Sequence, residues 1–269
     1  MRTLLPLLLL SSGCALGPGE PFATLSARVG AQLSHAAGRD TADGFQKLSN
    51  DYQVKFTVLR LDAPALGLVD LGSGATLAFD PADPPEGYGL CHNGHCHRDD
   101  GALVDYAVIS AEVSGGGGPS AVASLPVPSA LDALAGTELP LDCGNACALP
   151  ASRVGQVGLR VSGLVVEGMV RDGRPQARLE QQPFRLQVTL PEGSALSTPT
   201  DIEVSRHASP RLDVALSVLV GAPLLDGIPF EQLPLVAGAL DAYPASLPEV
   251  QAQVRVNLAE SELKVAVER

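Results

Sequence analysis

Apolar and polar residues alternate along many short segments of this chain. In segment 52–61 (YQVKFTVLRL) every second residue from Tyr52 to Val58 is apolar, and segment 184–190 (FRLQVTL) repeats the pattern. A period of two places the apolar side chains on one face of an extended strand. The same alternation predicts further strands over 103–109, 157–166, 212–220, 250–258 and 263–267.

Stretches rich in glycine and proline separate these segments, as expected for turns. Segment 172–175 (DGRP) predicts the tip of a hairpin, and the glycine run 115–118 predicts a flexible loop. Two other stretches, 129–135 and 230–242, predict short helices. Strands at this spacing with no regular helices between them predict antiparallel pairing. We therefore expect residues 23–269 to form one all-β domain, an antiparallel β-sandwich or open barrel.

The composition agrees with a turn-rich β protein and excludes one class of partner. The 269 residues include 28 Gly and 22 Pro but no Trp, and the formal net charge is −12. Binding to nucleic acid requires a basic face that contacts phosphates, so nucleic acid is not an expected partner.

The first 13 residues have the order of a secretory signal. Arg2 precedes an apolar run over 4–10, and small residues follow up to Cys14. The run is well short of the about 20 apolar residues that a membrane-spanning helix needs. We therefore expect residues 1–13 to be a signal peptide that is removed on export.

The end of this signal, SSGC at 11–14, resembles the lipobox of bacterial lipoproteins. The resemblance implies that Cys14 receives a lipid, that residues 14–22 form a tether, and that the membrane is a partner through the lipid. Ser11 stands where the family normally has Leu, and simple secretion is the alternative. Ala15, in place of Asp, implies by the family's sorting rule an outer-membrane lipoprotein that faces the periplasm or the cell surface.

Four cysteines remain in the expected mature chain, and they form two close pairs in the sequence. They are Cys91, Cys96, Cys143 and Cys147. An even number of cysteines in an exported chain indicates disulfides, and each close pair is already held together by a short loop. Local bridging is therefore expected. Crossed bridges between the pairs and a four-thiolate zinc site are the alternatives.

Three of the five histidines lie within the segment LCHNGHCHRDDG, as His92, His95 and His97. Histidines two apart share one side of an extended segment, and the NG dipeptide is a tight-turn signal that folds His92 back toward the other two. Converging imidazoles are typical ligands of a transition metal. Asp99 and Asp100 are candidates for a fourth ligand or for hydrogen bonds to the ring nitrogens.

The ligand set favours Cu(II) or Zn(II), with copper higher in the Irving–Williams order. A disulfide between Cys91 and Cys96 closes the same turn and lowers the entropy lost on binding. A histidine-bearing loop on an all-β lipoprotein is similar in class to secreted copper-binding β-sandwich proteins of the methanobactin-associated type. That resemblance is confined to the loop and implies copper binding.

The segment CHNGHCH also satisfies a widened form of the c-type haem attachment motif. In that interpretation Cys91 and Cys96 carry the thioether bonds and His97 is an axial ligand. His207 and Met169 are then the candidates for the sixth ligand.

Catalytic motifs are missing, because the chain has no GxSxG elbow, HExxH pair, P-loop or EF-hand spacing. The sequence therefore favours a binding protein over an enzyme. A structural or interaction lipoprotein of the envelope, with a bridged loop and no metal, is the alternative. His35 and His207 stand alone and are expected to face solvent or to form hydrogen bonds.

Overall fold

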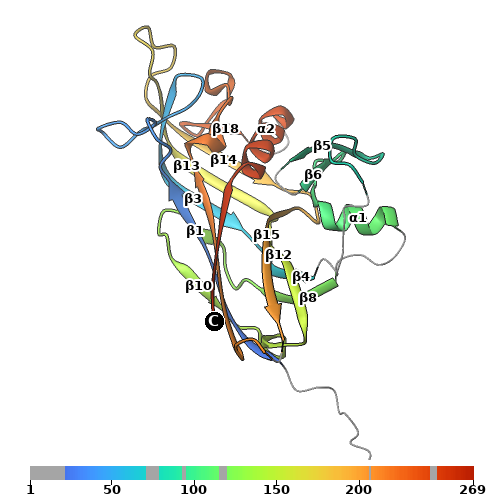
Figure 1. Cartoon of the computed structure of the whole chain (residues 1–269). Helices are drawn as coiled ribbons and strands as arrows, with labels where there is room; N and C mark the ends of the chain where they lie inside the picture. The colour runs from blue at the N-terminus through green and yellow to red at the C-terminus, as the bar shows by residue number, and fades with distance from the viewer. Residues whose placement is uncertain (1–21, 71–78, 93–94, 115–119, 206, 243–246) are drawn as a thin grey trace, which may run out of the picture.

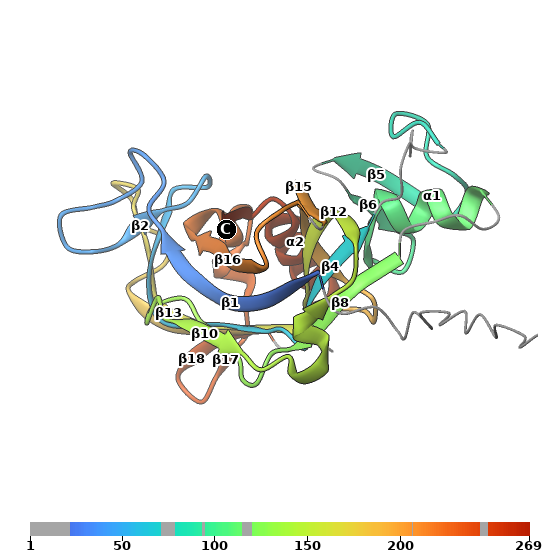
Figure 2. The same ribbon diagram turned by 60° about the horizontal axis from the view of Figure 1, so that its bottom comes forward.

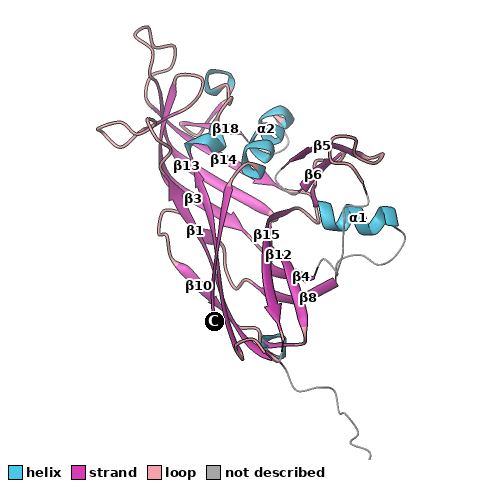
Figure 3. Cartoon of the chain, viewed as in Figure 1, coloured by secondary structure: helices cyan, strands magenta, loops and turns pink. Residues whose placement is uncertain are grey.

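A computed structural model describes residues 22–70, 79–92, 95–114, 120–205, 207–242 and 247–269 (Figure 1). Strands dominate the described chain, and the two α-helices are short (Figure 3). The all-β prediction is therefore confirmed. The predicted signal peptide, Cys14 and all but the last residue of the tether lie outside the described residues, as does the glycine run 115–118. None of the described helices is long and apolar enough to cross a membrane.

One sheet is built around the first strand of the described chain. In order it contains β10 (Glu138–Leu141), β1 (Ala23–Ser34), β16 (Arg211–Gly221) and β19 (Glu262–Glu268), with β11 (Ala148–Leu149) also paired to β1. The prediction of antiparallel pairing fails at the centre of this sheet, because β1 and β16 are parallel from Thr24 to Ser34. These strands are far apart in the sequence, so no tight turn constrains their direction.

A second sheet forms the opposite layer. In order it contains β17 (Leu235–Val236), β18 (Ala239–Ala242), β14 (Gln182–Thr189), β13 (Gly163–Asp172), β3 (Tyr52–Asp62) and β2 (Gln46–Lys47), with β9 (Leu131–Asp132) paired to β3. A third sheet has the order β15 (Ala195–Val204), β12 (Ser152–Arg160), β4 (Ala65–Asp70) and β8 (Ser120–Pro126).

Three pairs of consecutive strands connect the second and third sheets across a corner. The pairs are β3 with β4, β12 with β13, and β14 with β15. Backbone hydrogen bonds continue through this corner, from Ser162 N to Asp62 O and from Leu190 N to Ser162 O. Gly163 stands at the bend, where a Cβ would lie 3.0 Å from the carboxylate of Asp62 and 3.3 Å from the carbonyl of Val188. Strands that change sheet at a bend are typical of folded-over sandwiches. The segment 157–166, predicted as one strand, therefore divides between β12 and β13.

The three sheets enclose one hydrophobic core. Its fully buried residues come from every sheet and include Val29, Leu68, Val166 and Leu216. The alternation of β1, with buried Leu25, Ala27 and Val29 separated by exposed residues, shows how period two selects the core face. The sheets do not close into a barrel, and the fold is sandwich-like.

A smaller module is inserted between β4 and β8, which pair with each other. It contains β5 (Tyr88–His92), β6 (His95–Arg98), β7 (Leu103–Asp105) and helix α1 (Tyr106–Ser114). Cys96, Ala102, Val104 and Ile109 form a separate small core inside it. In both views the module lies at one end of the molecule beside β4, β8 and β12, whereas β2 lies at the other end (Figures 1 and 2).

Two predicted strands are wholly or partly helical. Segment 250–258 is part of helix α2 (Pro248–Ala259). Val250, Val254 and Leu258 are spaced by four, so they share one helix face, and all three are buried. Val256 lies off this face and is partly exposed. Pro248 at the start of the helix is the signal that the alternation concealed. Segment 103–109 begins as β7 but continues as α1, in which Tyr106 and Ile109, three apart, face the small core.

Both predicted helices are wrong. Segment 129–135 contains the short strand β9 followed by a turn. Segment 230–242 contains one 3₁₀ turn (Phe230–Gln232) and then the hairpin β17–β18. The other 3₁₀ turns are Gly144–Cys147 and Ala222–Leu225. The tight hairpin tip predicted at 172–175 is not formed, because residues 173–181 are a loop and the strand that pairs with β13, β14, begins only at Gln182.

Candidate metal centre

The histidine segment forms a short antiparallel hairpin. Cys91 of β5 pairs directly with Cys96 of β6, and His92 pairs directly with His95. The predicted NG turn, residues 93–94, lies outside the described residues. The first histidine is nevertheless folded back beside the second, as the sequence predicted.

The two faces of this hairpin carry different chemistry, because successive side chains of a strand point to opposite faces. The disulfide Cys91–Cys96 lies on the face that packs into the small core of the module. The three histidines share the other face. Leu103, which pairs with His97 on the neighbouring strand, is fully buried in the main core, so the histidine face turns toward the body of the protein.

The ligand nitrogens of His92, His95 and His97 converge. Each residue offers one ring nitrogen, and these atoms lie within 4.8 Å of one another. The Nε2 atoms of His92 and His97 are 3.0 Å apart, and the ring centroids lie 4.6 to 5.5 Å apart. Among the residues that the structure describes, no other group of three His, Cys, Asp or Glu side chains forms a cluster that could hold a metal ion. The predicted ligand set is thus brought together.

This spacing is close to what a bound ion requires. Imidazole nitrogens bind zinc at about 2.0–2.1 Å, so two of them on one ion are at most about 4.2 Å apart, and about 3.3 Å apart in a tetrahedral site. The Nε2 atoms of His92 and His97, 3.0 Å apart, therefore have to separate slightly, and the most widely spaced pair of ring nitrogens has to approach slightly. Movements below about 1 Å are within the reach of small side-chain rotations.

Burial of the site favours neutral imidazole, the form that binds metals. His95 is only 2% exposed, and His92 and His97 are half-buried. Burial lowers the pKa of His97, the neighbouring His92 lowers it further, and the carboxylate of Glu260 partly opposes this effect. The His97 ring is therefore neutral at and above neutral pH.

Glu260 is a residue of this site that the sequence did not reveal. It follows directly after α2, and its Oε1 lies 3.0 Å from Nδ1 of His92. That nitrogen is shielded from solvent, and its ring N–H direction is not aligned on the carboxylate as in an ideal hydrogen bond. The short distance still places the carboxylate beside this nitrogen, and the Glu260 side chain is 54% exposed. Since Glu260 lies far along the chain from the histidines, no local pattern could link them.

The two aspartates predicted near the site lie outside the histidine cluster. Asp100 accepts hydrogen bonds from the guanidinium of Arg98 and from the backbone N–H of Ala102, which closes the turn after β6. Asp99 is exposed in the same turn and is not part of the histidine cluster. The expectation of an aspartate ligand is therefore not met, because both residues lie beyond the end of the strand.

The four cysteines are paired locally, as predicted. Cys143 and Cys147 form the second disulfide, and both pack against the main core, whereas Cys96 belongs to the small core of the module. Neither crossed bridges nor a four-thiolate site is formed, because the two pairs belong to different hydrophobic clusters.

The haem interpretation finds no support in the arrangement of the hairpin. Both sulfur atoms that it requires are bonded to each other, and they lie on the face opposite His97. Met169 is on β13 in the large sheet, and His207 is exposed in the connection between β15 and β16.

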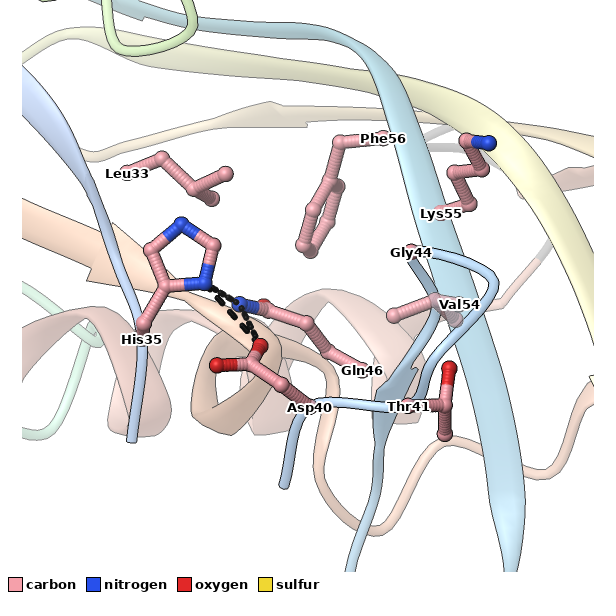
Figure 4. A pocket seen from close by; sticks show the side chains of 9 residues that line it. All are labelled: Leu33, His35, Asp40, Thr41, Gly44, Gln46, Val54, Lys55 and Phe56. Carbon is pink, nitrogen blue, oxygen red and sulfur yellow. Dashed lines mark hydrogen bonds and ion pairs between the residues drawn. The ribbon is translucent and has the colours of Figure 1, made fainter. Parts of the chain in front are cut away.

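The remaining histidine, His35, lines a separate pocket of about 350 Å³ (Figure 4). Its Nδ1 lies 2.9 Å from Oδ1 of Asp40 and 3.1 Å from Nε2 of Gln46. The prediction that His35 forms hydrogen bonds and faces solvent is confirmed. Gln46 also donates to Asp40, so these polar groups satisfy one another. The pocket therefore offers no second metal cluster within the described chain.

Comparisons with protein-family models, with curated proteins and with solved structures found no match. The function is therefore argued from this chain's own residues.

Proposed function

We propose that this protein captures a divalent transition metal, Cu(II) or Zn(II), through His92, His95 and His97. The observation that carries the proposal is the convergence of the three ring nitrogens within 4.8 Å on one face of a hairpin. Clusters of imidazole bind such ions well because the ring nitrogen is a borderline-soft donor. A site with three protein ligands leaves a position for water or for a further donor.

The surroundings of the cluster support binding by a prepared site. The disulfide Cys91–Cys96 joins the two strands next to the paired histidines, so the ligands are held close before the ion arrives. Less conformational entropy is then lost on binding. The formal net charge of −12 also favours a cation as the ligand.

Among the two ions, copper is the stronger candidate by intrinsic affinity. The Irving–Williams order places Cu(II) above Zn(II) for a given nitrogen site. Availability of each metal also decides which ion a protein carries. We therefore propose both ions as test ligands and expect the tighter complex with Cu(II).

The proposed location is the bacterial cell envelope, with a lipid on Cys14 that anchors the protein to the outer membrane. The signal-like N-terminus and the two disulfides support an exported protein. Figure 1 shows β1 starting at the lower end of the body and β5 and β6 near the upper end. An anchor before β1 would thus place the histidine module away from the membrane.

The second candidate is an envelope protein that docks a partner and binds no metal. The edge strand β17 favours this alternative, because Leu235 is 63% exposed and Val236 is 47% exposed there. Exposed apolar residues on an unpaired sheet edge are typical of interaction surfaces.

Titration of the purified, untagged protein with Cu(II) and Zn(II) distinguishes these functions. We expect one equivalent to bind the wild type and none to bind a His92→Ala/His95→Ala/His97→Ala variant. A His35→Ala/His207→Ala variant is the matched control and should bind as the wild type does.

Because His95 is buried, the triple variant is checked for folding by circular dichroism, and the single variants His92→Ala and His97→Ala provide a milder test. Equally weak binding by the wild type and all cluster variants would exclude the metal function and favour the docking alternative.

A further inference from the structure

The proposed centre includes one feature that its three ligands do not explain, which is the carboxylate of Glu260 beside His92. The contact joins two distant parts of the fold, the inserted module and the end of helix α2. It reaches Nδ1 of His92, while Nε2 of the same ring faces His97 at 3.0 Å.

A neutral imidazole carries its single proton on one of two nitrogens, and only the other nitrogen can bind a metal. A carboxylate is an acceptor, so contact with Glu260 favours the tautomer with the proton on Nδ1 of His92. The lone pair of His92 then lies on Nε2, on the side of His97. Carboxylate, histidine and metal in this order form a common arrangement in metal sites.

We infer that Glu260 is a positioning residue that holds His92 in the metal-binding tautomer and orients its Nε2 toward the centre. This inference rests on the proposed function, since it assigns a role at the same site. Glu260 acts through His92 and is not itself a ligand in this arrangement.

The surroundings of Glu260 support a cation at this place. Helix α2 ends at Ala259, and its last turn contains no basic side chain. The partial negative charge of the final carbonyl groups and the charge of Glu260 are both favourable to a nearby cation.

The test compares Glu260→Ala and Glu260→Gln with the matched control Glu262→Gln. Glu262 is two residues further along, and its side chain is 64% exposed compared with 54% for Glu260. We expect Glu260→Ala to weaken Zn(II) binding by about 10- to 100-fold. Glu260→Gln should lose less, because its amide oxygen still presents a partial negative charge to Nδ1 of His92, and the control should bind as the wild type does.

A second readout follows the tautomer directly and needs no metal. In the metal-free wild type, ¹⁵N NMR of the His92 ring should show the proton on Nδ1, and in Glu260→Ala it should show a mixture of both tautomers. A purely structural role would not produce this change. If Glu260→Ala loses affinity for Zn(II) while the ¹⁵N shifts of its His92 ring are unchanged, the positioning role is refuted. The role is also refuted if neither the affinity nor the shifts change.

The two readouts separate this inference from the function on which it rests. If the wild type binds neither Zn(II) nor Cu(II), the metal function fails, while the ring shifts still report on Glu260. If the wild type binds and Glu260→Ala is indistinguishable from it by both measurements, only the role of Glu260 fails.

Discussion

Removing the disulfide of the histidine hairpin should weaken metal binding by a calculable amount. Cys91 and Cys96 are bonded across the pair of strands, and the next pair in the register is His92 with His95. A short hairpin is marginally stable by itself. In a Cys91→Ala/Cys96→Ala variant, conformations with separated strands therefore compete with the arrangement that binds the ion.

The size of the effect follows from the length of the closed loop. The two cysteines are five positions apart, and the entropy of closing so short a loop corresponds to about 2 kcal/mol. If the open conformations cannot bind, the affinity falls by at most this free energy. About 2 kcal/mol corresponds to a dissociation constant about 30-fold higher.

The other disulfide provides a matched control. Cys143 and Cys147 are four positions apart, so their loop constrains the unfolded chain by a similar amount, also about 2 kcal/mol. Both disulfides include a buried cysteine. The Cys143→Ala/Cys147→Ala variant should therefore lose comparable global stability while binding the metal normally.

Competition between each variant and a chelating indicator for Zn(II) at neutral pH measures the difference in affinity. Unchanged affinity in the Cys91→Ala/Cys96→Ala variant would refute the reasoning, because other contacts would then suffice to hold the histidines. Equal weakening in both disulfide variants would also refute it, since the effect would then come from global stability.

Three further predictions concern the fold that carries the site. Leu258→Ala should lower the free energy of unfolding, measured by urea denaturation, by about 2–5 kcal/mol, because this α2 side chain is fully buried. The control Val256→Ala, on the partly exposed side of α2, should change the free energy of unfolding by less than about 0.5 kcal/mol. The guanidinium of Arg174 holds the pKa of the buried Asp172 carboxyl far below its usual range. The ionised carboxylate therefore stabilises the folded protein above about pH 4, and this contribution is lost as the pH falls. Urea midpoints of Asp172→Asn should thus fall below those of the wild type at pH 7, with the gap narrowing toward pH 2, and a constant gap would contradict this. Gly168→Ala should lower the free energy of unfolding by about 1–3 kcal/mol, because the added Cβ would meet a backbone carbonyl of β3 at a bulge. Thermal denaturation measures this effect, and an unchanged melting temperature would contradict the close approach.

Strand identity was predictable wherever one face of a strand is buried. The alternation over 52–61 and 184–190 corresponds to β3 and β14, because period two is typical of a half-buried strand, and segment 212–220 corresponds to β16, whose centre is buried on both faces. Where side chains spaced by two and by four coincide, as at Val250 and Val254, the sequence did not separate strand from helix. Packing of α2 against the core decided that case.

What the sequence by itself determined is the information that lies within a few residues: the β class, the local pairing of the cysteines, and the three histidines that share one face of a hairpin. Each depends on side-chain alternation or on short loops, so neighbouring residues specify it. Only the tertiary structure decided the parallel pairing of β1 with β16, the corner between two sheets, and the placement of Glu260 beside His92. These features join residues far apart in the sequence, and their contacts exist only after the core has packed.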